Sequence, residues 1–383
     1  MKILLTALNS KFIHTNLAIR YLKAYTKDID YECTLKEYTI NDLMEKVLQS
    51  IIIEKPDIIG FSCYIWNIDK VKKLCKLIKL VDSSINIFLG GPEVSYDCRK
   101  VLQDIDADYL IEGEGEETYR EFVIKKINGE SLEKVKGLYY RDDAEIKYSG
   151  ERELMDMNDL VFPYNDDDNF DNKIIYYEAS RGCPFKCSYC LSAAIKGLRF
   201  LNIDRVKKEL DFFIRKKVRL VKFVDRTFNA DRNFTYEIWN YLINKKECST
   251  TFHFEISANL LTDDLISLLQ KSPKGRIQLE IGVQTTNSRI LKNIDRHIEF
   301  DDIKGKILNI QKYGNVNQHL DLIAGLPEEN FDSYRKSFND IYSTNVSQIQ
   351  MGFLKVLHGS PMESQTKKWG IVYSPYPPYE VIK

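Results

Sequence analysis

Short apolar runs alternate with amphipathic stretches along most of the 383-residue chain, and this alternation restricts the fold more than any other feature. Runs of this length suit buried strands, and the stretches between them have the period of helices that cover a sheet. Strands separated by helices pair in parallel, because the chain returns to the same end of the sheet before each new strand. The sequence therefore predicts an α/β protein built on parallel sheets.

The first part of the chain predicts a doubly wound sheet. Its apolar runs are 2–8, 57–62, 85–89 and 108–111, with helical stretches such as 17–26 and 68–80 between them. Ligands of such sheets bind beyond the carboxyl ends of the strands. The residues that gather at these ends are our candidates for a ligand site: Ser62, Gly90, Gly91, Glu112 and Gly113.

The alternation weakens between residues 127 and 172, where we place a linker. Residues 137–148 have the pattern of a hairpin, and 165–169 form a polar, acidic connector. The domains expected from this division are a doubly wound domain at 1–126, the linker at 127–172, a barrel at 173–372, and a flexible tail or the start of a truncated C-terminal region at 373–383.

The barrel is predicted from six strand-helix units, which are too few for the usual closed ring of eight. We expect a partial (β/α)6 barrel with its chemistry at the carboxyl ends of the strands. The predicted strands are 174–179, 218–225, 251–257, 276–283, 316–323 and 347–353, and the predicted helices are 203–217, 233–244, 263–271, 301–313 and 331–343.

Three cysteines, Cys183, Cys187 and Cys190, crowd together after the first predicted barrel strand. Thiolates are the usual ligands of iron–sulfur clusters, most of which take four. A four-iron cluster held by three thiolates keeps one iron open for another ligand. The alternatives are three incidental thiols or a zinc site, which needs a fourth ligand. No second C-x2-C pair and no histidine near 183–190 supplies one.

The spacing C-x3-C-x2-C, with an aromatic residue before the last cysteine, resembles the radical S-adenosylmethionine (SAM) superfamily. The resemblance continues through 280–284 (EIGVQ), 321–327 (DLIAGLP) and 354–361 (LKVLHGSP), which are similar to elements of the anaerobic coproporphyrinogen oxidase, methylthiotransferase and Elongator-like branches. It implies a [4Fe-4S] cluster that binds SAM and yields a 5'-deoxyadenosyl radical. It also implies cofactor contacts at Tyr189, Glu280 and Gln284.

Other polar residues near the expected SAM site can be assigned in two ways. Asp225 and Ser257 face the same strand ends and are either cofactor-binding or structural. Glu280 can equally form an ion pair inside the barrel mouth, because a carboxylate between Leu279 and Ile281 needs a polar partner.

The amino-terminal domain resembles that of the cobalamin-dependent radical SAM enzymes. The resemblance rests on 60–62 (GFS), 89–93 (LGGPE) and 112–118 (EGEGEET), and it implies cobalamin near Ser62 and the glycine pair. Relatives that ligate cobalt through histidine carry D-x-H-x-x-G, whereas Phe12 and Leu17 flank His14 here. We therefore expect no ligation of cobalt by His14. The alternative for this domain is a sheet that lacks the cofactor and serves docking or substrate binding.

The resemblance implies radical methylation or rearrangement at an unactivated carbon of an unknown substrate. The alternatives are a tRNA-modifying methylthiotransferase-like or Elongator-like enzyme and a non-catalytic cobalamin or redox sensor. With 55 basic and 56 acidic residues, the net charge of -1 gives no support for a nucleic-acid partner. A reducing electron donor such as flavodoxin or ferredoxin is an expected partner.

The surroundings of the protein are predicted from apolar runs and cysteines. No run approaches the roughly 20 apolar residues that cross a bilayer, so no membrane partner is expected. Residues 1–8 lack a basic region and a cleavage site, which indicates a strand rather than a signal peptide. The eight cysteines are expected to be thiols of a reducing compartment, which predicts a cytoplasmic protein.

Overall fold

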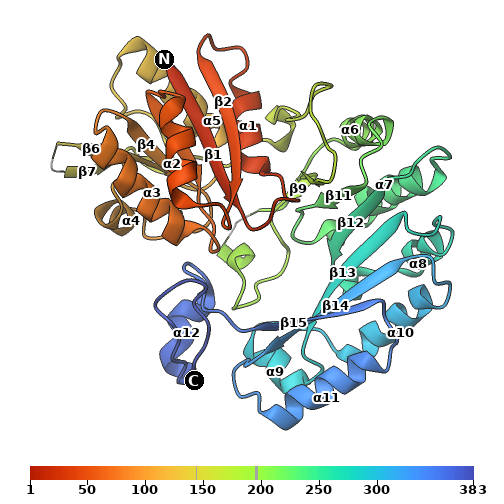
Figure 1. Ribbon diagram of the computed structural model, residues 1–383. Coiled ribbons are helices and arrows are strands. Elements are labelled where there is room, and N and C mark those ends of the chain that lie inside the picture. The colour runs from red at the N-terminus through yellow and green to blue at the C-terminus, as the bar shows by residue number, and fades with distance from the viewer. Residues whose placement is uncertain (144, 195–196) are drawn as a thin grey trace. The chain divides into compact units, whose positions relative to one another are not determined.

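The computed structural model describes residues 1–143, 145–194 and 197–383, which divide into two compact units, Met1–Asn169 and Phe170–Lys383 (Figure 1). The first unit is a doubly wound sheet covered by helices, and the second is an open parallel barrel. Both parts of the predicted fold class are confirmed.

The sheet of the first unit has seven strands in the described residues, in the order β2-β1-β3-β4-β5-β6-β7. The strands β1 to β5 run parallel, and β6 and β7 add an antiparallel hairpin to β5. The hairpin predicted within the linker thus lies in this sheet. The strands are β1 (Lys2–Asn9), β2 (Glu32–Thr39), β3 (Ile58–Ser62), β4 (Asn86–Gly90), β5 (Tyr109–Ile111), β6 (Leu138–Asp142) and β7 (Glu145–Tyr148).

Helices cover both faces of this sheet. One apolar layer joins the sheet to α2 (Met44–Ile53), α3 (Ile68–Val81) and α4 (Cys98–Asp104), and the other joins it to α1 (Leu17–Tyr25) and α5 (Glu116–Asn128). Every residue of β3 is buried, because the strand is covered on both sides.

The strand β2 was not predicted from the sequence. It lies at the edge of the sheet and pairs only with β1 among the described strands. Its sequence, ECTLKEYT, is polar and half-buried, as an edge strand tolerates. Its carboxylate Glu37 nevertheless reaches the carboxyl end of β1 and accepts a hydrogen bond from Asn9 Nδ2 at 2.7 Å.

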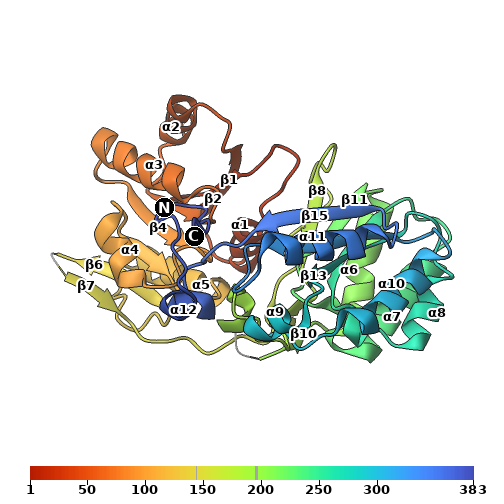
Figure 2. The ribbon, with the colours of Figure 1, turned by 90° about the horizontal axis from the view of Figure 1, so that it is seen from below.

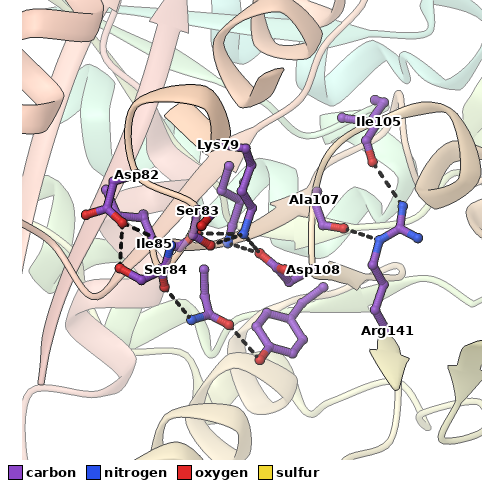
Figure 3. Close-up of polar contacts among 12 residues, drawn as sticks. Lys79, Asp82, Ser83, Ser84, Ile85, Ile105, Ala107, Asp108 and Arg141 are labelled. Atoms are coloured by element: carbon purple, nitrogen blue, oxygen red, sulfur yellow. Dashed lines mark hydrogen bonds and ion pairs between the residues drawn. The ribbon is translucent and has the colours of Figure 1, made fainter. Parts of the chain in front are cut away.

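Polar contacts link the amino ends of β4 and β5 to the carboxyl end of the antiparallel strand β6 (Figure 3). Asp108 accepts hydrogen bonds from the backbone N–H of Ile87 at 2.7 Å and from Lys79 Nζ at 2.7 Å. Arg141 donates from Nε to the carbonyl of Ala107 at 2.8 Å. These bonds lie at the edge of the sheet where β4 and β5 begin, so the opposite edge, where both strands end, remains for a ligand site.

The second unit contains a parallel sheet of six strands in its described part, in the order β15-β14-β13-β12-β11-β8. β8 and β15 are its two edges, so the barrel is open, and the helices cover its outer face (Figures 1 and 2). The strands are β8 (Ile174–Tyr177), β11 (Leu220–Phe223), β12 (Thr251–Ile256), β13 (Ile277–Gln284), β14 (Asn317–Ala324) and β15 (Gln348–Phe353), and the covering helices are α6 (Ile203–Arg215), α7 (Arg232–Asn244), α8 (Asp263–Leu269), α10 (Phe300–Gln311) and α11 (Phe331–Tyr342).

Side chains alternate across this sheet. Phe252 and Phe254 of β12 are fully buried in the aromatic layer under the helices, together with Phe223, Phe228 and Trp239. The intervening residues of the strand point into the barrel and are polar. The barrel therefore has an apolar outer face and a charged inner face.

The end of the chain folds back on the barrel unit. Residues 354–383, which we name the C-terminal segment, contain α12 (Pro361–Trp369). The backbone N–H of Val381 donates to the carbonyl of Leu354 at 3.1 Å, and that of Val356 donates to Tyr379 at 3.0 Å. Residues 373–383 are therefore hydrogen-bonded to residues 354–356, at the start of the same segment, rather than forming the flexible tail that was one of our two expectations.

Candidate functional site

The cysteine loop follows β8 and depends on one glycine. Gly182 has φ of +98°, a conformation that side chains other than glycine rarely adopt. A Cβ atom there would lie 1.9 Å from the carbonyl oxygen of Gly197. The close approach of these two backbones shapes the loop just before Cys183.

Each thiol of the loop has a polar neighbour. Cys183 Sγ lies 3.3 Å from Thr227 Oγ1, Arg296 Nη1 donates to Cys187 Sγ at 3.5 Å, and the backbone N–H of Ser192 donates to Cys190 Sγ at 3.4 Å. All three cysteines are free of disulfides. Donors of this kind stabilise thiolates and the sulfurs of a cluster.

The three thiols lie within electrostatic reach of one another. Burial raises the pKa of Cys187, the Arg296 guanidinium opposes this, and the neighbouring Cys190 and Cys183 raise the pKa further. In the part of the chain that is described, no group of three or more His, Cys, Asp or Glu side chains is already arranged around a metal position. The donor set, three soft ligands on one loop with hydrogen-bond donors beside them, fits an iron–sulfur cluster.

The cysteine loop is tied to two other segments. The backbone N–H of Ser188 donates to Ile294 at 3.0 Å, and its carbonyl accepts from the N–H of Met362 at 2.7 Å. Ile294 follows α9 (Ser288–Asn293), and Met362 lies in the first turn of α12. The loop is thus held from both sides at a residue between two of its cysteines.

Tyr189 packs against an apolar cluster below the loop. The cluster is formed mainly by α9, the loop after β14 and the C-terminal segment, and its buried members are Ile290, Leu291, Ile294, Leu326, Leu354, Val356 and Met362. Burial raises the pKa of Tyr189 well above its usual range. The ring therefore has a packing role that the sequence, from which we expected a cofactor contact at Tyr189, did not indicate.

Glu280 takes part in an ion-pair network on the inner face of the barrel. Its Oε2 lies 2.8 Å from His253 Nε2 and 3.0 Å from Lys222 Nζ. The hydrogen bond from His253 outweighs burial and, with Lys222, lowers the pKa of Glu280 to about 2. The sequence left two interpretations of Glu280 open, a cofactor contact and an ion pair, and the structure contains the ion pair.

Gln284 ends β13 at a bulge. The register with β14 shifts between Gly282 and Gln284, and Gln284 has φ of +70°. Its amide covers Gly282 so closely that a Cβ there would lie 2.3 Å from Nε2. Arg296 Nη2 donates to the Gly282 carbonyl at 2.5 Å, so this strand end and Cys187 share one guanidinium.

Asp225 and Ser257 are buried in structural hydrogen bonds. Asp225 is 0% exposed and accepts from Ser180 Oγ at 2.6 Å and from the N–H of Ala179 at 3.0 Å. Ser257 is 4% exposed and its hydroxyl donates to Asn259 Oδ1 at 2.5 Å. In this structure both side chains are buried and hydrogen-bonded within the protein.

Two polar residues near the cysteine loop and the inner face were not among our candidates. Arg296 lies beyond the motifs read from the sequence, and only its contacts with Cys187 and Gly282 reveal it. Asp321 begins the DLIAGLP stretch, and its Oδ1 is buried without a hydrogen-bond partner among the described residues. Burial, with Glu280 and Glu255 nearby, raises the pKa of Asp321 to about 8.

The carboxyl ends of the first sheet carry a buried network of amides. Ser62 Oγ accepts from Asn16 Nδ2 at 3.0 Å, and Asn67 Nδ2 donates to the carbonyls of Ser62 and Leu8 at 2.9 and 3.1 Å. These bonds fix the loops that follow β1 and β3. The strand ends are therefore pre-shaped before any ligand binds.

The two glycines after β4 differ in their surroundings. A Cβ at Gly91, where φ is +113°, would lie 2.6 Å from the carbonyl oxygen of Cys63. At Gly90 the nearest atom to such a Cβ is 3.9 Å away, in Ile111. Gly91 is required by the protein's own backbone, whereas Gly90 leaves room beside the strand end.

Glu112 and Gly113 have different surroundings in the structure. Glu112 Oε2 accepts from the Tyr148 hydroxyl at 2.6 Å, and its Oε1 accepts from Cys98 Sγ at 3.7 Å, so this carboxylate joins β7 and α4. Gly113 is exposed, with φ of +69° and open space where a side chain would lie.

The loop after β1 presents apolar side chains. Phe12 is 67% exposed and Ile13 40%, and the Trp66 indole, stacked on Tyr64 in the loop after β3, is 43% exposed. The carbonyl of His14 accepts from Asn9 Nδ2 at 3.0 Å, which holds the loop. An exposed apolar surface beside glycine and serine strand ends fits a wide, flat macrocycle.

Family comparisons decide between the readings of both units. Residues 3–123 match the family model of the B12 binding domain, and residues 177–341 match that of the Radical SAM superfamily. The chain belongs to the radical SAM enzymes that carry a cobalamin-binding domain. The cofactors of this family are a [4Fe-4S] cluster, SAM and cobalamin, as we predicted from the cysteines and the strand ends.

Relatives of this radical SAM protein include named methyltransferases. It is 22% identical over 329 residues to the uncharacterized methyltransferase PH0819 of Pyrococcus horikoshii, covering 82% of this chain and 70% of that protein. It is 24% identical over 345 residues to the cobalamin-dependent radical SAM methyltransferase TokK of Streptomyces tokunonensis, covering 82% of this chain and 49% of TokK. The chain thus spans about half the length of TokK.

A solved structure shows the same fold. The radical SAM methyltransferase TsrM of Kitasatospora setae, with cobalamin and a [4Fe-4S] cluster bound, matches with a TM-score of 0.79 at 14% identity, over 98% of this chain and 76% of TsrM. Together the comparisons favour the cobalamin-dependent interpretation over the tRNA-modifying and sensor alternatives.

Enzymes of the family need a reductant. In the described residues, no helix is long and apolar enough to span a membrane.

Proposed function

We propose that this radical SAM protein methylates, or rearranges, an unactivated carbon of its substrate with the help of cobalamin. The observation that carries the proposal is the presence in one chain of the three-thiol loop after β8 and a B12-binding sheet with glycine and serine strand ends. Relatives with this combination include methyltransferases by name.

The cysteine loop holds the cluster in this proposal. Cys183, Cys187 and Cys190 would hold the cluster through three of its irons, and the fourth would be open to the amino and carboxylate groups of SAM. When bound, the reduced cluster would supply the electron that cleaves SAM to methionine and a 5'-deoxyadenosyl radical, and cobalamin, methylated beforehand by another SAM molecule, would supply the methyl group. Thr227 and the N–H of Ser192 stabilise the charged sulfurs from outside.

The inner face beside the loop binds SAM. The Arg296 guanidinium, already between Cys187 and the Gly282 carbonyl, pairs with the SAM carboxylate, because this fork recognises carboxylates well. Asp321, with its unpaired Oδ1, accepts hydrogen bonds from the ribose hydroxyls. Gln284, on the bulge of β13, contacts the methionine or ribose part. Glu280 orients Lys222 and His253 instead of touching SAM.

The carboxyl ends of the first sheet bind cobalamin. Ser62 and Gly90 face the cofactor, and Gly113 admits part of it close to the backbone. Phe12, Ile13 and Trp66 supply apolar contact rather than a cobalt ligand. The electron donor is a small redox protein such as flavodoxin or ferredoxin.

The test is anaerobic purification and cluster reconstitution of single cysteine variants. Changing Cys183, Cys187 or Cys190 to alanine is expected to remove iron, sulfide and the thiolate-to-iron absorption, together with 5'-deoxyadenosine formation from SAM and a chemical reductant. Cys248→Ala is the matched control, because this thiol lies outside the loop and donates to Thr250 O at 3.7 Å. Zinc without iron at the three positions would overturn the proposal.

A further inference from the structure

The edge strand β2 places a carboxylate at the loop that follows β1. Residues 10–16, which we name the β1 loop, begin after Asn9 and end at Asn16, and each of these asparagines is 5% exposed. Glu37 Oε2 accepts hydrogen bonds from Asn9 Nδ2 at 2.7 Å and from the backbone N–H of Asn16 at 2.9 Å. One carboxylate oxygen thus holds the loop at both of its ends.

The side chains of the two asparagines extend this constraint. Asn9 Nδ2 also donates to the carbonyl of His14 at 3.0 Å, so the amide uses both of its hydrogens. Asn16 is the N-cap of α1: its Oδ1 accepts from the N–H of Ile19 at 3.1 Å, and its Nδ2 donates to Ser62 Oγ at 3.0 Å. The β1 loop is therefore connected to the start of α1 and to the end of β3.

A largely buried arginine lies beside the other oxygen of Glu37. Arg20 Nε lies 3.5 Å from Glu37 Oε1, and Arg20 Nη1 forms an ion pair with Asp168 Oδ1 at 2.8 Å. The guanidinium carbon lies 5.4 Å from the centre of the Tyr164 ring. Asp168 and Tyr164 hold the cation, and the cation favours the orientation in which the carboxylate faces the loop.

The middle of the β1 loop is exposed. Phe12 is 67% and Ile13 40% exposed, and the proposed function assigns both to the cobalamin surface. A ligand that binds a disordered loop must supply the free energy that orders it. Without Glu37, the N–H of Asn16 and one hydrogen of Asn9 would be buried without this acceptor, which destabilises the ordered loop.

We propose that Glu37 is a positioning residue for cobalamin: it keeps the β1 loop in the conformation that presents Phe12 and Ile13 to the corrin ring. The inference rests on the proposed function. Glu37 acts through the loop and not on the cofactor. Its loss lowers the fraction of molecules with an ordered loop, and the apparent dissociation constant rises by the reciprocal of that fraction.

The experiment is a titration of the full-length chain with hydroxocobalamin. Glu37→Ala is expected to weaken binding about tenfold, because two hydrogen bonds to a charged acceptor are lost. Glu37→Gln keeps an oxygen that can accept from Asn9 and Asn16, so it is expected to restore most of the affinity. The visible circular dichroism of the bound corrinoid at saturation should change in Glu37→Ala, since it reports the surroundings of the ring.

The matched control is Glu32→Ala. This glutamate begins the same strand, its side chain is 62% exposed, and it pairs with Lys2 at 2.9 Å. Its loss removes the same charge from β2 at the opposite end of the strand. The affinity and the circular dichroism of the bound corrinoid should equal those of the wild type.

Hydrogen exchange without cobalamin tests the loop itself. In the wild type, the N–H of Asn16 is expected to be protected before any ligand is added, because Glu37 already accepts its hydrogen bond. Residues 10–16 should exchange faster in Glu37→Ala and at the wild-type rate in Glu32→Ala.

Three outcomes overturn the inference: wild-type affinity in Glu37→Ala, equal weakening in Glu37→Ala and Glu37→Gln, and a β1 loop that is unprotected in the wild type without cobalamin. Each leaves the proposed function intact. A wild-type chain that binds no corrinoid overturns the cobalamin part of the proposed function, and this inference with it.

Discussion

Gly90 and Gly91 are adjacent, yet they need glycine for different reasons. The sequence suggested that both let cobalamin approach the backbone, but Gly91 is required by contact with Cys63 within the protein. A bulky residue at Gly91 therefore tests folding and not corrinoid binding. Gly90 is the position that separates the two effects.

We predict that Gly91→Ala destabilises the first unit by more than about 1 kcal/mol, because it combines a positive φ with a clash against Cys63. Gly90→Ala should melt at nearly the wild-type temperature and bind corrinoid more weakly. Thermal melting and corrinoid titration of both variants check this. Equal corrinoid affinity of Gly90→Ala and the wild type would exclude Gly90 from the cobalamin site.

The buried carboxyl of Asp225 predicts a pH-dependent stability. Burial raises its pKa to about 7, against hydrogen bonds from Ser180 and Ala179 that lower it. Because the folded pKa lies above the unfolded value, its stabilising contribution is full in acid and is lost as pH rises through about 7.

The free energy of unfolding should therefore decrease less between pH 5 and pH 8 in Asp225→Asn than in the wild type, and the two decreases should differ by about 2 kcal/mol. The asparagine amide keeps an acceptor for Ala179 and can donate to Ser180. Denaturant unfolding at several pH values measures the difference. Parallel curves for the variant and the wild type would show that Asp225 does not titrate in this range.

The sequence around His14 differs from that of a cobalt-ligating histidine. Such a ring is oriented by an aspartate two residues earlier, where this chain has Phe12, which is 67% exposed. We predict no nitrogen splitting from a protein histidine in the cob(II)alamin EPR spectrum, and nearly unchanged corrinoid affinity in His14→Ala. A nitrogen triplet that disappears in the variant would show that His14 does bind cobalt.

At the scale of elements, the sequence was most informative where apolar periodicity was strong. The six barrel strands and β1, β3, β4 and β5 each lie within a predicted run or extend one residue beyond it. The edge strand β2 was missed, because its pattern is set by pairing with β1 rather than by burial. The cysteines were predictable because one loop holds them all, whereas Arg296 reaches Cys187 only through tertiary packing.

The C-terminal segment is the element whose role the sequence left undefined. Its Met362 N–H donates a hydrogen bond to the carbonyl of Ser188, and several of its side chains belong to the apolar cluster that Tyr189 packs against. Ending the chain at Gly359 should therefore lower iron retention after reconstitution, since the loop loses one of its two anchors.

The control for this truncation is Val372→Ala, in a side chain of the same segment that is 53% exposed. It should retain iron at the wild-type level. Circular dichroism establishes whether the truncated barrel remains folded. A folded, truncated chain with full iron content would show that the segment does not support the loop.

At the scale of the whole molecule, two units each place their candidate residues at the carboxyl ends of parallel strands. The cysteine loop follows β8, and the Ser62 and Gly90 positions end β3 and β4. This rule made the general location of both sites predictable from sequence. It did not separate binding residues from structural ones, because Asp225, Ser257 and Glu112 meet the same rule and are bonded within the protein.

The central claim is that three thiolates hold a cluster with an iron open to SAM. The most direct measurement is the EPR spectrum of the reduced, reconstituted chain before and after SAM is added. We predict about four irons per chain and a spectrum that changes on addition, because SAM binds the iron that has no cysteine ligand. A fully occupied cluster whose spectrum is unaffected by excess SAM would contradict the account.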